Sequence, residues 1–264
     1  MNWRNIFIPL FVLMYSCGSK PNNQQKEAGK DLVINNFSID SSMSDSARLI
    51  KIETLIEKEQ YNEAISHIDY LLNSNPDNPA WLFIKADALE RKRDTISALS
   101  FYLKADSVAG KFPQARMAIL NIYAETQNPQ TLPYSKLLLD DPASEKIQSD
   151  ILMMQGIYYS KTGKWNMAEA IYSKIIKQNY TFLQAYIEKG LLYYDRQDYK
   201  KALDIFALST EVKNDFADGY FWMGKTYHKL NQKEMAILNF KKSLALDPSI
   251  QEAREELKTL GAIQ

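Results

Sequence analysis

The sequence contains very little of the side-chain chemistry that most active sites require. Its 264 residues include one cysteine and two histidines. A single cysteine excludes a disulfide within the chain and any metal site built from paired cysteines. The histidines, His67 and His228, lie far apart along the chain, and neither forms a His-x-x-x-His motif. We therefore expect no metal, no cofactor and no enzymatic activity; an enzyme or carrier with an unrecognised site is the alternative.

An excess of charge of either sign is also missing. Lysine and arginine together number 32, as do aspartate and glutamate, so the formal net charge is +0. A balanced composition gives no indication of nucleic acid or of an anionic membrane surface as a partner. No glycine-rich phosphate loop is present either, and no small-molecule substrate is indicated.

A hydrophobic run long enough to cross a bilayer is the third absence. The stretch from Ile6 to Tyr15 is uncharged, but ten residues make only about 15 Å of helix, half of a bilayer core of about 30 Å. Arg4 precedes this stretch, and a basic start followed by a short apolar segment is typical of a secretory signal. We expect residues 1–17 to act as a signal peptide.

The end of this segment resembles a bacterial lipobox, in which a cysteine follows small residues. Ser16 and Met14 fit the pattern, whereas Tyr15 departs from it because a small residue is usual there. The resemblance implies that Cys17 becomes the first residue of the mature chain and carries a diacylglyceryl group and often a further chain such as palmitate. The implied location is the outer membrane, where the lipoprotein would face the periplasm. The alternative is an ordinary signal peptide cut near Gly18, which would release a soluble binding module.

The segment at 18–44 is mostly polar and lacks helical periodicity. This composition is typical of a flexible tether, with one apolar patch at residues 32–34.

From residue 45 onwards the sequence repeats with a period of 34 residues. Three consecutive copies place small residues and large apolar residues in the same columns. The columns hold Tyr220, Gly224, Tyr227, Ala236 and Phe240 in residues 217–250; Tyr186, Gly190, Tyr193, Ala202 and Phe206 in 183–216; and Leu152, Gly156, Tyr159, Ala168 and Tyr172 in 149–182. This pattern resembles the tetratricopeptide repeat, a pair of antiparallel helices that stacks on its neighbours.

The resemblance implies an all-α fold, a right-handed α-solenoid of about six helix pairs with a C-terminal capping helix. The predicted repeats are 45–78, 79–112, 113–148, 149–182, 183–216 and 217–250, and the cap with its tail is 251–264. The third copy is degenerate, since Pro129 and Pro133 stretch its inner turn. This suggests two rigid blocks, 45–112 and 149–260, joined by a softer middle.

The family's architecture implies a peptide or protein partner in a concave groove lined by the first helix of each repeat. The predicted groove is acidic at its N-terminal end, apolar in the middle and basic at its C-terminal end. Glu53, Asp87 and Glu90 stand where the family's carboxylate clamp needs basic residues, which argues against a C-terminal carboxylate as ligand. The candidate groove residues are Phe83, Asp87, Glu90, Met117, Asn121, Met153, Ile157, Ile187, Leu191, Tyr194, Phe221, Lys225 and His228.

By architecture the chain resembles repeat lipoproteins that assemble outer-membrane machines or act as adaptors for periplasmic enzymes. A non-enzymatic scaffold anchored through Cys17 is therefore the function we expect.

Overall fold

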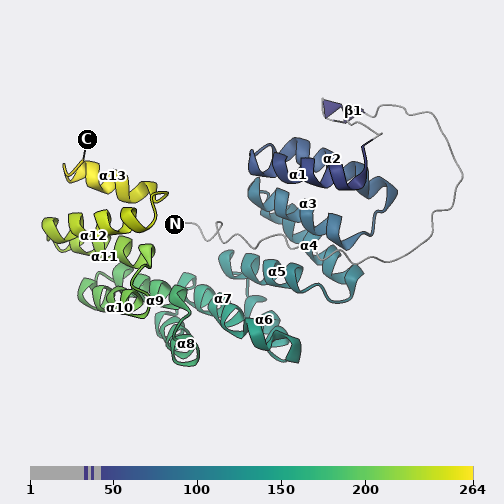
Figure 1. Cartoon of the computed structure of the whole chain (residues 1–264). Coiled ribbons are helices and arrows are strands. Elements are labelled where there is room, and N and C mark those ends of the chain that lie inside the picture. Colours follow the sequence, from purple (N-terminus) through teal and green to yellow (C-terminus); the bar gives the residue numbers. More distant parts are fainter. Residues whose placement is uncertain (1–32, 35–36, 39–42, 264) are drawn as a thin grey trace, which may run out of the picture. The chain divides into compact units, whose positions relative to one another are not determined.

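The computed structural model describes residues 33–34, 37–38 and 43–263. The predicted leader with Cys17, and most of the predicted tether, lie outside these residues. Within the tether, the strands β1 (Val33–Ile34) and β2 (Phe37–Ser38) pair in antiparallel fashion, with Val33 opposite Ser38 and Ile34 opposite Phe37. From residue 45 onwards the described chain is built from helices and short connections (Figure 1).

The helices form consecutive pairs, and we call the two members of each pair the first and second helix. The first helices are α1 (Asp45–Glu57), α3 (Pro79–Arg91), α5 (Pro113–Glu125), α7 (Gln148–Lys161), α9 (Leu183–Asp195) and α11 (Ala217–Lys229). The second helices are α2 (Tyr61–Ser74), α4 (Thr95–Ala109), α6 (Thr131–Leu139), α8 (Trp165–Gln178), α10 (Tyr199–Val212) and α12 (Lys233–Leu246). A final helix, α13 (Gln251–Thr259), packs on α12. The predicted α-solenoid fold class is confirmed.

A three-residue turn joins the two helices of every pair except the third. Its middle residue has a left-handed backbone conformation, with φ between 59° and 73° at Glu59, Arg93, Gly163, Gln197 and Asn231. The next residue donates its backbone N–H to the carbonyl five residues earlier, as from Asp198 to Tyr193 at 2.9 Å. This bond closes the end of the first helix, and it offsets the cost of about 1 kcal/mol for a non-glycine residue in this conformation.

Close approach of the two helices within a pair explains the small residues of the sequence pattern. A Cβ atom added at Gly190 would lie 2.2 Å from Cε1 of Phe206, and the same conflict exists between Gly156 and Tyr172 and between Gly224 and Phe240. These three rings are fully buried. Each glycine therefore leaves the space that the ring of the second helix fills.

The third pair departs from the others. Its inner turn has five residues, 126–130, and α6 has only nine residues, of which Pro133 occupies the third. A proline is tolerated there because the first turn of a helix has no partner for its N–H groups. A 3-10 helix, η2 (Pro142–Ile147), without buried residues leads from α6 into α7.

The chain divides into two compact units within α5, one ending at Ile119 and one beginning at Leu120. In the N-terminal unit, α1, α2 and α3 share a core that includes Ile52, Ile68 and Ile84. In the C-terminal unit, Phe221 and Phe240 of the last pair pack with Leu257 of α13, so α13 covers the last apolar surface of the repeats.

Candidate functional site

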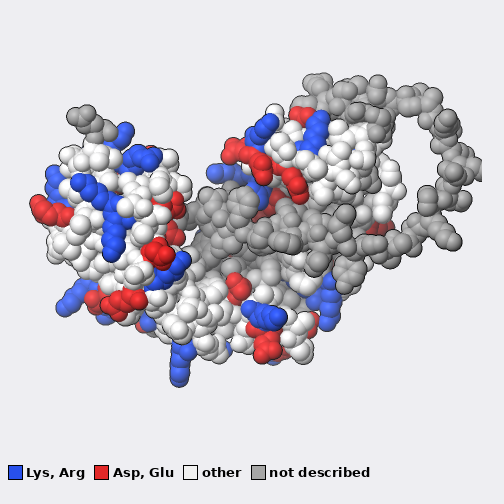
Figure 2. Space-filling view, in the orientation of Figure 1, with Lys and Arg blue, Asp and Glu red and all other residues white. Residues whose placement is uncertain are grey.

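The candidate residues of the N-terminal unit are engaged by their own neighbours. The ring of Phe83 lies 5.4 Å from that of Tyr102 and 5.2 Å from that of Phe112. Asp87 accepts a hydrogen bond from Nε of Arg91 at 2.9 Å, and Glu90 accepts one from the hydroxyl of Tyr102 at 3.0 Å. In Figure 2 acidic and basic side chains stand side by side on this unit.

These contacts hold two of the predicted acidic groove residues against neighbours within the chain. Burial raises the pKa of Asp87, and the charge and hydrogen bond of Arg91 oppose that rise. The Arg91 side chain is the exposed partner of this ion pair, so the pair presents both signs of charge to solvent.

Four predicted groove residues of the C-terminal unit belong to the core. Met153, Ile157, Ile187 and Phe221 are at most 4 % exposed. Phe221, for example, lies 5.3 Å from the ring of Trp222 and 5.9 Å from that of Phe240. Their assignment to a partner-binding groove was wrong, because these side chains have almost no surface to offer.

The other candidates keep part of their surface. Met117 and Asn121 of α5 are half-buried, as are Leu191 and Tyr194 of α9 and Lys225 and His228 of α11. We call Leu191, Tyr194, Lys225 and His228 the first-helix face of the C-terminal unit. These four residues occupy equivalent positions in two consecutive first helices, 34 residues apart.

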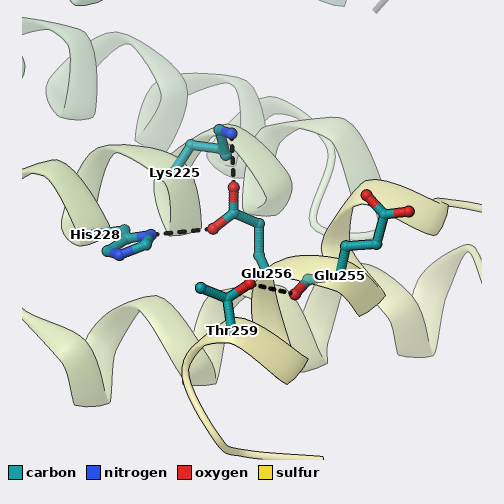
Figure 3. Close-up of polar contacts among 5 residues, drawn as sticks. All are labelled: Lys225, His228, Glu255, Glu256 and Thr259. Atoms are coloured by element: carbon teal, nitrogen blue, oxygen red, sulfur yellow. Dashed lines mark hydrogen bonds and ion pairs between the residues drawn. The ribbon is translucent and has the colours of Figure 1, made fainter.

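A carboxylate from α13 joins this face (Figure 3). Glu256 accepts a hydrogen bond from Nζ of Lys225 at 2.7 Å through one oxygen and from Nδ1–H of His228 at 3.0 Å through the other. Its side chain is 19 % exposed. The hydroxyl of Thr259 on the same helix donates a hydrogen bond to the backbone carbonyl of Glu255, at 3.0 Å.

The charge of Glu256 is stabilised where it lies. Partial burial alone would raise its pKa, but the hydrogen bond and charge of Lys225, followed by those of His228, outweigh burial and hold the pKa below its usual value. Lys225 and His228 of the predicted basic end of the groove therefore already have a carboxylate partner within the chain.

Tyr194 provides the aromatic part of the face. Its ring makes edge contacts with Tyr199 at 5.4 Å and with Trp222 at 5.8 Å. Burial, the neighbouring Tyr199 and the charge of Glu256 raise the pKa of Tyr194 to about 12. Tyr194 is therefore a neutral hydroxyl at physiological pH, suited to hydrogen bonding and apolar contact rather than to proton transfer.

Glu256 is the residue that the sequence analysis missed. The signal was present, because α13 begins 34 residues after α11 and thus continues the repeat register. Glu256 occupies the column of Trp222, whose ring contacts Tyr194 of the preceding first helix. Extending the columns past residue 250 would have placed Glu256 against Lys225 and His228.

The described residues offer no cluster of three or more His, Cys, Asp or Glu side chains that could hold a metal ion. His67 lies in the N-terminal unit, fully buried, and its Nδ1 accepts a hydrogen bond from Arg48 at 3.1 Å. Burial, and then the charges of Lys51 and Arg48, lower the pKa of His67. His67 is thus a neutral core histidine in a different unit from His228.

A shallow pocket of about 400 Å³ lies between α2, α3 and α4. Both of its lysines are already paired, Lys85 with Asp69 at 2.6 Å and Lys104 with Asp77 at 3.1 Å. It presents no nucleophile beside a base and no free cation for an anionic ligand.

Comparison with known proteins supports a family assignment. Two family models described as tetratricopeptide repeat match this chain, one at residues 51–116 and 153–215 and the other at 217–250. Together these matches span more than half of the sequence. The chain belongs to the tetratricopeptide repeat family. Proteins of this family bind peptides or protein partners and are typically non-catalytic scaffolds.

Solved structures share the fold. A tetratricopeptide repeat protein from Parabacteroides merdae ATCC 43184 has a TM-score of 0.64 at 17% identity, with 81% of this chain and 83% of that chain covered. PilW, a widely conserved type IV pilus biogenesis factor, has a TM-score of 0.60 at 17% identity, covering 80% of this chain and 97% of that chain.

Among curated proteins, Tetratricopeptide repeat protein 1 of Schizosaccharomyces pombe is 22% identical over 214 residues. The match covers 72% of this chain but 20% of that protein, so the chain spans about a fifth of its relative.

Proposed function

We propose that this tetratricopeptide repeat protein is a non-enzymatic scaffold of a bacterial envelope that binds a peptide or protein segment on the first-helix face of its C-terminal unit. The observation that carries the proposal is the partial exposure of Leu191, Tyr194, Lys225 and His228 on two consecutive first helices. Tyrosine is a frequent anchor at interfaces because its ring gives apolar contact and its hydroxyl a hydrogen bond.

The internal pairing of Glu256 constrains the partner. An acidic partner group would have to compete with Glu256 for Lys225 and His228, which already hold it at 2.7 and 3.0 Å. Apolar and neutral polar groups face no such competition at Leu191 and Tyr194. A partner segment with an apolar or aromatic anchor therefore fits this face better than an acidic one.

Binding is tested by crosslinking in cells followed by recovery of the chain from membranes. The variant Tyr194→Ala removes the aromatic anchor, and Tyr180→Ala is the matched control because Tyr180 is 67 % exposed in the connection between α8 and α9. We expect Tyr194→Ala to lose one defined crosslinked partner that Tyr180→Ala retains. Unchanged recovery by Tyr194→Ala, with an unchanged melting temperature, would contradict the assignment of the face.

We further propose that lipid on Cys17 anchors the chain in the outer membrane, facing the periplasm. Support comes from the basic start, the short apolar segment and the serine before the only cysteine. One acyl chain gives marginal membrane binding and stable attachment needs more than one, which the diacylglyceryl group of a bacterial lipoprotein would supply.

Membrane fractionation of Cys17→Ser tests the anchor. We expect the variant to keep its leader uncleaved or to appear in the soluble fraction, and to lose incorporation of labelled palmitate. Incorporation of palmitate equal to that of the parent chain would exclude Cys17 as the lipidated residue, whatever the outcome at Tyr194.

A further inference from the structure

Exposed large apolar side chains gather on the second helices. Among the described residues with such side chains, only Ile50 and Tyr180 lie elsewhere. The others are Ile96, Leu103 and Val108 of α4, Leu137 of α6, Met167 of α8, Leu208 of α10, and Met235, Leu238 and Leu246 of α12. The first helices, which are the usual partner-binding helices of this fold, contribute only Ile50 of α1 to the exposed large apolar side chains of the described residues.

In the C-terminal unit the same helices are rich in exposed lysine. We call the exposed residues of α8, α10 and α12 the second-helix face. Its basic members are Lys174, Lys177, Lys200, Lys201, Lys233, Lys241 and Lys242, and its acidic members are Asp204, Glu211 and Glu234. The balanced charge of the whole sequence conceals this local excess. Figure 2 shows a basic side chain that projects into solvent where α8 lies.

Most of these lysines are available. Lys201 pairs with Asp198 at 3.0 Å, and Nζ of Lys242 lies 4.0 Å from the ring centre of Tyr220. For the other five, no described carboxylate forms an ion pair. A lysine without an ion-pair partner can bind an anionic ligand, because no ion pair inside the protein has to be broken first.

Helix α12 shows how apolar and basic groups combine. Met235, Leu238 and Lys242 follow one another at helical spacings of three and four residues, and Leu246 continues the row. Met235 is 40 % and Leu238 59 % exposed. The opposite side of α12 buries Ala236 and Phe240 in the core, so the row sits on a fixed helix.

The combination of exposed apolar and basic side chains indicates what kind of partner can bind the second-helix face. Lysines interspersed among exposed leucine and methionine are typical of helices that lie at the surface of a bilayer, with the apolar groups at headgroup depth and the lysines at the lipid phosphates. A dry protein interface, by contrast, is depleted in lysine.

We infer that the second-helix face of the C-terminal unit docks on a bilayer that contains anionic lipid. The contact involves α8, α10 and α12, whereas the proposed partner contacts α9 and α11. Docking therefore leaves the first-helix face available and does not depend on the proposed function.

Vesicle flotation of the full chain carrying Cys17→Ser tests this inference without acylation. The probes are vesicles of phosphatidylethanolamine with phosphatidylglycerol, and vesicles of phosphatidylcholine alone. The test variant combines Lys177→Glu with Lys241→Glu. The control combines Lys229→Glu with Lys258→Glu, two exposed lysines of α11 and α13 that give the same change in net charge. The leader is common to all chains and cancels in the comparison.

Each lysine near an anionic surface strengthens binding about fivefold. We therefore expect the test variant, which loses two such lysines, to bind the phosphatidylglycerol vesicles about thirtyfold more weakly. The control should change by less than about threefold. Leu238→Ser, at an exposed site that tolerates substitution, should also weaken binding. Equal losses in test and control, no loss in either, or equal binding to phosphatidylcholine would overturn the inference. If the test variant bound vesicles as the parent does but lost a protein that is crosslinked to the parent in cells, the second-helix face would be assigned to a protein partner instead.

Discussion

At the scale of single residues, the pairing of a glycine with a ring decides how closely two helices pack. Gly190→Ala adds a methyl group 2.2 Å from Phe206, which is fully buried. Overpacking costs roughly 1–3 kcal/mol, whereas alanine gains about 1 kcal/mol in helix propensity. We expect a net loss of up to about 2 kcal/mol in the free energy of unfolding, measured by urea denaturation.

The control for this prediction is Phe206→Leu, which makes room for the methyl group. In that background Gly190→Ala should cost nothing or stabilise, so the two substitutions should be non-additive by 1 kcal/mol or more. Additive losses would mean that Gly190 is required for a reason other than the ring.

At the same scale, the charge of Glu256 makes the free energy of unfolding depend on pH. Its pKa is held below the ordinary value of 4.5, so its contribution is present above that value and is lost as pH falls through the folded pKa. We expect Glu256→Gln to lower the free energy of unfolding by about 1 kcal/mol at pH 7, allowing for the partial exposure of the pair. The difference between the two chains should shrink as pH falls below 4.5 and the carboxylate of Glu256 becomes protonated.

Glu255→Gln is the matched control, because Glu255 is exposed and its side chain forms no described hydrogen bond. A pH-independent difference between the parent and Glu256→Gln would show that the charge of Glu256 is irrelevant and that only its shape matters.

The sequence predicted the packing residues more accurately than the binding residues. Gly190 and Phe206 follow from their columns, because the distance between two paired helices varies little among repeats. Phe221 was misplaced because the fifth position of a first helix faces both the groove and the neighbouring repeat, and only three-dimensional packing decides between them. Glu256 was missed because the repeat columns were not continued past residue 250 into α13, where it lies.

At the scale of helices, α13 completes the last apolar surface of the repeats. Leu257 is 1 % exposed and packs with Phe221 and Phe240. Leu257→Ala should lower the free energy of unfolding by about 2–4 kcal/mol through the cavity it leaves. Lys258→Ala, an exposed neighbour on the same helix, should change it by less than about 0.5 kcal/mol. Thermal and urea unfolding of both variants measure the contrast.

The third helix pair is the element in which sequence and structure agree on an irregularity. Pro129 and Pro133 indicate a longer inner turn, and the turn has five residues before a nine-residue α6. A short helix with a 3-10 segment behind it has fewer buried backbone bonds to protect. We expect amides of α6 to exchange at least tenfold faster than those of α9, as measured by hydrogen exchange. Equal protection of α6 and α9 would contradict the prediction of a softer middle.

The scale of the whole molecule is where sequence reasoning was weakest. The 34-residue period predicts the helix pairs because each repeat solves the same local packing problem. The division into two compact units falls within α5, inside a single helix, where no change in composition announces it. The lysine excess of the second-helix face is equally hidden, because it depends on which lysines are exposed.

A repeat fold predicts how damage spreads through the molecule. Because each pair contacts mainly its neighbours, a loss in one core should weaken nearby helices most. Phe240→Ala, at a fully buried site, should cost roughly 3–5 kcal/mol and accelerate hydrogen exchange in α11, α12 and α13, with α1 and α2 unchanged. Ile68→Ala in the N-terminal core is the mirror-image control and should accelerate exchange in α1, α2 and α3 only. Equal acceleration of α2 and α12 by either variant would mean that the chain opens as one cooperative body. A local response would mean that each unit can loosen, and so be regulated, without unfolding the other unit.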